Sequence, residues 1–176
     1  VLFRSRGGGV YFTGSSDTKT LTVLRSTISG NATLNGRGGG IVAASSSGYV
    51  VVVDSTIADN TAGYGYGGGI VVDDNQSFTM RNSTVSGNSA GLYGGGVWLD
   101  TYTTDILQST ISGNTAGQAG GVYVGDNGGA TIAMSTITDN SATAPYTSPA
   151  VHGVQVGLYP GSTATVPAGT LILTGT

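Results

Sequence analysis

The chain has 176 residues, enough for one domain of ordinary size, and contains 32 Gly, no Cys and only 9% charged residues. Its net charge of −3 comes without a cluster of Lys and Arg, which argues against nucleic-acid binding, and the lack of Cys excludes a disulfide framework or a thiolate metal site. No apolar run approaches the ~20 residues of a membrane-spanning helix. Helix formers are scarce while Val, Ile, Thr and Tyr are abundant, so the composition predicts an all-β protein.

Two motifs recur along the chain with the same period. The first has the form Ser-Thr-Ile-x-x-Asn, and its Ser residues, 29, 28, 26 and 26 residues apart, are Ser26, Ser55, Ser83, Ser109 and Ser135. The second is Gly-Gly followed by Val or Ile, and its copies end at Val10, Ile41, Ile70, Val97 and Val122. Independent motifs that share a period of about 27 residues predict a repeat fold.

Each copy contains three short segments of strand-forming residues. The first lies at residues 20–25, 49–54, 77–82, 104–108 and 130–134, the second is Ser-Thr-Ile itself, and the third follows the glycines, as at 70–72. Such short strands with no helix between them do not form βαβ units. They suit a solenoid whose coils pair about 4.8 Å apart. We therefore predict a single-stranded parallel β-helix of about five full coils of ~27 residues plus a worn final coil.

Side-chain alternation within the strands predicts apolar columns that stack from coil to coil. The columns are Val23, Val52, Met80, Ile106 and Ile132; Ile28, Ile57, Val85, Ile111 and Ile137; Val10, Ile41, Ile70, Val97 and Val122; and Phe12, Ala43, Val72, Leu99 and Val124. A ladder of amide hydrogen bonds, at a turn that uses left-handed backbone, is expected for Asn31, Asn60, Asn88, Asn114 and Asn140. The Gly-Gly pairs are expected to permit positive φ or close backbone approach.

The C-terminal part departs from the repeat. We assign residues 1–140 to the coils and 141–176 to an irregular final coil or cap of the same domain, because all four Pro follow residue 144 and the Asn turn does not recur. Gly169-Thr170-Leu171 is interpreted as a last, worn copy of Ser-Thr-Ile. Since the chain starts at Val1 and residues 7–10 already match the middle of a repeat, we expect it to be part of a longer protein.

The motifs resemble those of known repeat families. Gly38-Gly39-Gly40-Ile41 is similar to the Gly-Gly-Ala-Ile of polymorphic outer-membrane autotransporter passengers, and Ile28-Ser29-Gly30-Asn31 is similar to their Phe-x-x-Asn. The chain looks still closer to the bacterial right-handed parallel β-helix repeat proteins, over about residues 7–140. This resemblance implies a right-handed β-helix, export and display at the cell surface, and, from the best-known members, adhesion.

An outward-facing aromatic stripe is one candidate binding site. Trp98 and Tyr123 are expected on neighbouring coils as a flat platform for sugar rings or a partner protein, with Tyr11 in the same column. The alternative is stacking that stiffens the sheet, or a stripe covered by a segment that is missing from this chain. The Gly-flanked loop residues offer either exposed contacts or local plugs, and they are Tyr64, Tyr66, Leu92 and Tyr93.

A carboxylate cluster beside that stripe is the second candidate. Asp73 and Asp100 fall in one column, and Asp74 and Asp126 in the next. They could serve as catalytic residues in glycoside hydrolysis, bind Ca²⁺ weakly, or occupy solvated turns. Beyond that Ca²⁺, no cofactor or metal site is expected.

A lyase-like arrangement of Asp with a nearby base is not favoured by the sequence. Lys19 and Arg37 show no matching column, Arg81 lies on a different strand from the carboxylates, and His152 has no acidic partner nearby.

These patterns favour a non-catalytic, secreted or cell-surface solenoid that presents an extended face to a polysaccharide or a surface protein. The runner-up is a carbohydrate-active β-helix enzyme, a polysaccharide hydrolase or lyase, that uses the Asp cluster. A purely structural spacer is the third alternative. We expect an extracellular or outer-membrane-associated location, no nucleic-acid partner and no membrane-spanning segment in this chain.

Overall fold

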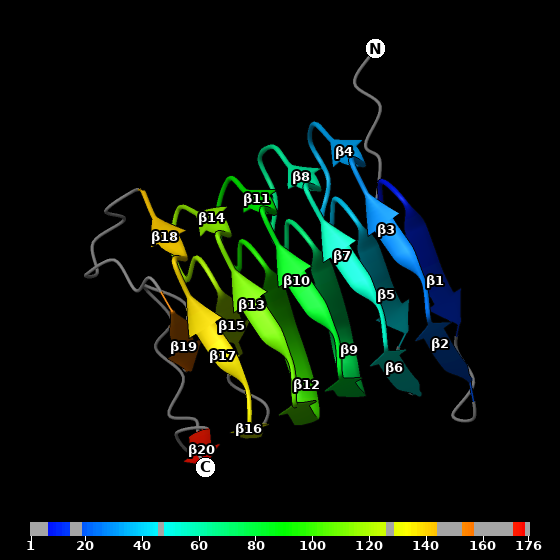
Figure 1. Cartoon of the computed structure of the whole chain (residues 1–176). Helices are drawn as coiled ribbons and strands as arrows, with labels where there is room; N and C mark the ends of the chain where they lie inside the picture. Colours follow the sequence, from blue (N-terminus) through cyan, green and yellow to red (C-terminus); the bar gives the residue numbers. More distant parts are fainter. Residues whose placement is uncertain are drawn as a thin grey trace, which may run out of the picture.

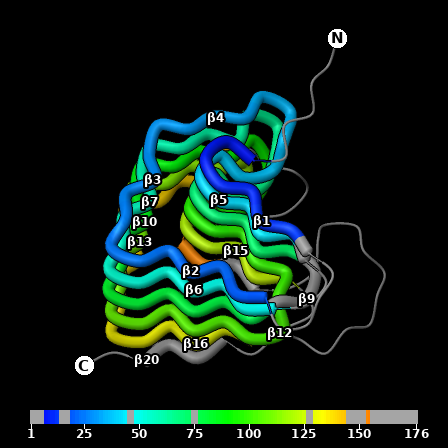
Figure 2. Tube along the Cα trace, turned by 90° about the vertical axis from the view of Figure 1, so that its right-hand side faces the viewer, coloured from blue at the N-terminus to red at the C-terminus, as the bar shows by residue number. Residues whose placement is uncertain are grey.

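The computed structural model describes residues 7–14, 19–45, 48–125, 129–143, 153–156 and 171–174. Within these ranges the chain winds into a parallel β-solenoid in which each strand pairs with its equivalent one coil away, as Figures 1 and 2 show. The described residues contain no α-helix, and hence none long and apolar enough to cross a membrane. The all-β solenoid predicted from the repeat is confirmed.

The strands of successive coils form three parallel sheets. The largest is formed by β1 (Val10–Gly14), β2 (Thr20–Leu24), β5 (Ile41–Ser45), β6 (Tyr49–Val53), β9 (Ile70–Arg81), β12 (Val97–Leu107), β15 (Val122–Val124), β16 (Gly129–Ala133), β19 (Val154–Val156) and β20 (Leu171–Thr174). The second, the Thr sheet, is formed by β3 (Thr27–Ser29), β7 (Thr56–Ala58), β10 (Thr84–Ser86), β13 (Thr110–Ser112) and β17 (Thr136–Thr138). The third is formed by β4 (Ala32–Thr33), β8 (Thr61–Ala62), β11 (Ser89–Ala90), β14 (Thr115–Ala116) and β18 (Ser141–Ala142).

The strand pattern differs from the prediction in two respects. A two-residue strand follows each Asn, because the chain stays extended beyond the turn and pairs with the next coil, as in the hydrogen bond from Thr61 N to Asn31 O at 2.8 Å. In addition, β9 and β12 each run through a corner that the sequence predicts as a break. From Thr27 to Thr136 the Thr sheet records about four turns, slightly fewer than the five full coils predicted.

The apolar columns predicted from side-chain alternation form the interior of the solenoid. All their members lie in one core cluster, and those of the middle coils, such as Ile57, Ile70 and Leu99, are 0% exposed. The cluster also contains Val50 and Phe78, which occupy equivalent positions on β6 and β9. The members at the two ends, among them Ile28 and Ile137, are only partly buried because a stacked coil covers them on one side among the described residues.

The left-handed turns lie one residue earlier than the sequence predicts. Positive φ falls not on the Asn but on the residue before it, at Gly30, Asp59, Gly87, Gly113 and Asp139. A second such column precedes each Ser, at Arg25, Asp54, Asn82, Gln108 and Met134. The Asn keeps an ordinary φ because its side chain must point inward to meet the next Asn, while the preceding residue makes the bend.

The Asn residues form a hydrogen-bonded ladder through the interior. Nδ2 of each donates to Oδ1 of the next, at 2.9 to 3.0 Å, through Asn31, Asn60, Asn88, Asn114 and Asn140. Glycine flanks the ladder because nothing larger fits: a Cβ on Gly69 would lie 3.0 Å from Nδ2 of Asn88 and 2.6 Å from O of Gly96. The Gly-Gly pairs therefore provide close approach, and the residue before a pair provides positive φ at Gly38, Gly67, Gly94 and Ala119.

The coil pairing continues past residue 140 where the chain is described. Strands β18, β19 and β20 extend the stack onto β14, β15 and β16. Leu171 pairs with Ala130, so this segment repeats the first strand of a coil. Our interpretation of Gly169-Thr170-Leu171 as a Ser-Thr-Ile copy was therefore wrong, because strand pairing and not local similarity sets the column.

Candidate functional site

The predicted aromatic stripe exists as a column on the outer face of the largest sheet. Strand register places Tyr11 beside Val42, Val42 beside Val71, Val71 beside Trp98 and Trp98 beside Tyr123. Each of these residues follows a core position by one, so its side chain leaves the interior. The stripe therefore lies where the pattern placed it, and what surrounds it decides whether a ligand can reach it.

A second column lies over this stripe, and we call it the cover column: Arg37, Tyr66, Tyr93 and Gln118. Backbone hydrogen bonds hold it in register, as from Gly67 N to Tyr93 O at 2.9 Å and from Gly94 N to Gln118 O at 3.1 Å. Each cover residue precedes a residue of positive φ, namely Gly38, Gly67, Gly94 and Ala119. The sharp left-handed turn brings the loop back over the sheet, so that the preceding side chain packs on the stripe.

The rings of the two columns form one packed layer. The centroid of Tyr66 lies 5.4 Å from that of Trp98 and 5.7 Å from that of Tyr93. Tyr93 in turn lies 5.3 Å from Tyr123, and Trp98 and Tyr123 are nearly parallel at 6.5 Å. These separations are those of favourable aromatic pairs. The layer is a second apolar cluster outside the main core.

The prediction that Trp98 and Tyr123 form an exposed platform was wrong about exposure. Trp98 is 2% exposed and Tyr123 is 0% exposed, because Tyr66 and Tyr93 cover them. A ligand could reach either ring only after the cover column had moved. Tyr11, the remaining candidate of the stripe, is 41% exposed. The stripe is covered, but by Tyr66 and Tyr93 of this chain and not by a missing segment.

Arg37 closes one end of the aromatic layer. Its guanidinium lies 5.4 Å from the centroid of Tyr66 and 5.7 Å from that of Trp98, and it forms an ion pair with Asp73. The sequence shows no column that relates Arg37 to the Asp cluster, whereas in the structure the loop carries Arg37 over the neighbouring coil, where it meets Asp73. A guanidinium stays protonated, so this pair neutralises a carboxylate and does not supply a base.

The carboxylate cluster is only partly assembled by the described residues. Val72 pairs with Leu99, and Asp73 and Asp100 are the next residues on these neighbouring strands. The strand register shifts directly after the Val72–Leu99 pair, so the regular pairing does not continue to the two aspartates. Among the described residues no group of three or more Asp or His side chains could hold a metal ion. The side chain of Asp74, and Asp126 and His152 altogether, lie outside the described residues.

Comparison with known families decides the classification of this chain. The model of the right-handed β-helix region matches residues 2–116, about two thirds of the chain. The chain belongs to the right-handed β-helix family. No curated protein and no solved structure gives a significant match.

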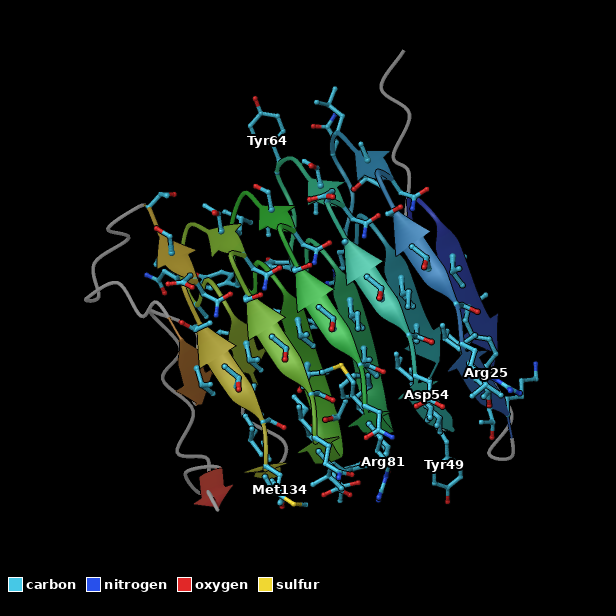
Figure 3. All side chains as sticks on the ribbon, in the orientation of Figure 1. Arg25, Tyr49, Asp54, Tyr64, Arg81 and Met134 are labelled. Atoms are coloured by element: carbon cyan, nitrogen blue, oxygen red, sulfur yellow. The ribbon has the colours of Figure 1, made fainter. Side chains whose placement is uncertain are left out.

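The β-helix carries a further exposed surface that the sequence analysis missed. We call it the tyrosine face: Tyr49, Ser77, Arg81, Tyr102 and Thr103. Tyr49, Ser77 and Thr103 fall in one column on three successive coils, and Thr103 Oγ1 donates to Ser77 Oγ at 2.9 Å. Tyr49 is 55% exposed and Tyr102 is 59% exposed, while the side chains of Tyr49 and Arg81 point away from the coils at one edge (Figure 3).

The tyrosine face escaped notice because it lies beside the corner where the copies of the repeat differ in length. Motif spacing aligns Ser and Gly positions but not the residues of this corner, so Tyr49 and Tyr102 matched no common column. The sequence signal that could have found them is a tyrosine at the start of one first strand segment, Tyr49, and another two residues ahead of a later one, Tyr102.

Proposed function

We propose that this β-helix is a non-catalytic, secreted or cell-surface protein that presents an extended face to a glycan. The observation that carries the proposal is the tyrosine face, where Tyr49 and Tyr102 expose their rings two coils apart, about 10 Å along the axis. Aromatic rings bind the apolar faces of sugars while the phenol oxygen keeps a polar contact. Two rings at that separation suit sugar units that are two apart along an extended polysaccharide.

The hydroxyl groups between the rings support the same ligand class. Ser77 and Thr103 offer donors and acceptors for sugar hydroxyls, and Arg81 adds guanidinium donors four residues beyond Ser77 on β9. Hydrogen bonding to several hydroxyls in a row gives orientation, while the rings give contact area. The ladders of the interior hold these groups in a fixed array, so little ordering is required on binding.

The proposed lack of catalysis rests on how the carboxylates are used. The carboxylate of Asp73 forms an ion pair with Arg37, which makes it a poorer general acid and a poorer nucleophile. Asp100 lies where the strand register shifts. The resemblance of the motifs to those of displayed β-helix repeats supports the proposed export and surface display. Surface labelling of intact cells that express the protein at full length tests that part of the proposal.

The binding proposal is tested with immobilised neutral and acidic polysaccharides, with and without Ca²⁺, scored for retention of the chain and for new chain ends. We expect retention without cleavage. Tyr49→Ala and Tyr102→Ala should each weaken retention by about 3- to 10-fold. Tyr64→Ala is the matched control, since Tyr64 is 72% exposed on a different edge, and Tyr11→Ala tests the remaining candidate of the stripe.

Each contrary outcome identifies an alternative. New ends of the polysaccharide chains would show that the protein is an enzyme and would make Asp73 and Asp100 the candidate catalytic residues. Retention that survives the Tyr49→Ala and Tyr102→Ala double substitution would exclude the tyrosine face. Failure of every glycan to retain the chain would leave a protein binder or a spacer.

A further inference from the structure

The β-helix has two edges that differ in charge. At one edge, the side chains of Arg25, Asp54 and Arg81 point outward together with Tyr49 (Figure 3). At the other edge lie the loop tips, which we define as residues 31–38, 60–67 and 88–94 of three successive coils. These loops contain a single charged residue, Arg37, and it is bound to Asp73.

The loop tips expose large apolar side chains. Leu34 is 70% exposed and Tyr64 is 72% exposed, the two most exposed large hydrophobic residues among those described, and Leu92 is partly exposed on the next coil. Tyr64 points away from the stack at the outermost part of this edge (Figure 3). Exposed apolar side chains gathered in one place mark an interaction site.

The backbone of the second and third tips is hydrogen-bonded to the preceding coil. Gly63 N donates to Thr33 O at 2.8 Å, Tyr64 N to Leu34 O at 3.1 Å, and Gly91 N to Ala62 O at 2.9 Å. Inserting a loop into an apolar phase is costly mainly when unpaired amide groups must leave water. Because the neighbouring coil pairs these amides, the tips at residues 60–67 and 88–94 can leave water at little cost.

We propose that the loop tips insert into the interfacial region of a lipid bilayer and hold the β-helix edge-on at a membrane surface. The size of the patch favours lipid over protein, since a few side chains offer about 300 Å², well below the ~800 Å² per partner of a stable protein interface. Leucine makes no hydrogen bond to a sugar, whereas Leu and Tyr suit the apolar and polar parts of a membrane interface. This attachment does not depend on glycan binding, and it would direct the charged edge away from the membrane.

The test uses cosedimentation of the chain with large phosphatidylcholine vesicles. We expect an apparent partition constant of about 10³–10⁴ M⁻¹, the range of other marginal anchors. The Leu34→Ser, Tyr64→Ser double variant should bind the vesicles at least about tenfold more weakly than the unaltered chain. The matched control is Leu24→Ser, Tyr49→Ser, which removes the same residue types, 44% and 55% exposed, from the opposite edge and should bind like the unaltered chain.

Salt and a fluorescent probe separate insertion from electrostatic adsorption to the vesicle surface. Binding should be the same in low and high salt, because the tips carry no unpaired charge among the described residues. The chain has no Cys, so an environment-sensitive dye can be placed at Leu34→Cys or at Leu24→Cys without other labelling. Its emission should shift to the blue on vesicle addition at position 34 only, a result that does not rely on the folding of a double variant.

The proposal is overturned if the chain stays in the supernatant at millimolar lipid, or if both double variants lose binding equally. Binding abolished by high salt would point to charge and not to insertion. A dimer seen without lipid, and lost in the Leu34→Ser, Tyr64→Ser variant, would assign the tips to a second copy of the chain and would also overturn the proposal.

Discussion

The side-chain oxygen of Asn88 accepts two hydrogen bonds from Asn60 on the neighbouring coil. This Oδ1 accepts from the backbone N of Asn60 at 2.9 Å and from the Nδ2 of Asn60 at 3.0 Å. The same oxygen therefore fixes a backbone and a side chain in a site that is 0% exposed. Repeated from coil to coil, this relationship holds the turn between the Thr sheet and the short third sheet.

Replacing Asn88 by Ala should lower the free energy of unfolding by at least ~3 kcal/mol, because Asn60 N, Asn114 Oδ1 and Ile57 O lose partners in the interior. Urea unfolding followed by circular dichroism measures the change. Asn31→Ala is the control, since Asn31 is only partly buried at the end of the ladder and should cost less. Equal losses at both positions would contradict a cooperative buried ladder.

Trp98 is the only tryptophan, so fluorescence reports directly on the aromatic layer. With 2% of its side chain exposed, it should emit at short wavelength and be quenched poorly by iodide in the native state. Tyr66→Ala should increase quenching because Tyr66 stacks on Trp98. Efficient quenching of the unaltered chain would instead indicate the open platform that the sequence predicts.

Gly67 tests the turn that folds the cover column back over the sheet. Gly67→Ala should cost about 2–4 kcal/mol of stability, because φ is +60° and the new Cβ would meet Ile70 O and Val71 Cγ2. Gly30→Ala is the matched control, with φ of +67° and nothing within 4 Å of the added atom, so that only the backbone cost remains. Thermal and urea unfolding of the two variants should differ clearly.

Gln108 is an exposed residue held at φ of +49°, a conformation that disfavours side chains with a Cβ. Gln108→Gly should raise the free energy of unfolding by about 0.5–1 kcal/mol, since relief of the left-handed strain exceeds the added freedom of the unfolded chain. Gln108→Val should lower it by more than ~1 kcal/mol, because a branched Cβ fits this region worst. The opposite order of the two variants in urea unfolding would show that the strain is not significant.

The interior of the coils could be predicted because the same side-chain interactions recur in every coil. A column such as Ile57, Val85 and Ile111 needs only an apolar side chain at a fixed spacing, and the Asn column needs only an amide at each turn. Both requirements are local and recur in every copy, so they leave a periodic signal in the sequence. The sequence also marked the outer positions of Trp98 and Tyr123 correctly, since alternation sets side-chain direction.

The sequence by itself determined the repeat, the columns of the core and the residues that leave it. Only the tertiary structure decided what covers them: the loops of one coil reach over the next, so Tyr66 buries Trp98 and Arg37 meets Asp73. Likewise, stacking alone brought Tyr49, Ser77 and Thr103 into one exposed column. Contacts between coils depend on loop length and on the handedness of single turns, and neither leaves a periodic trace in the residues.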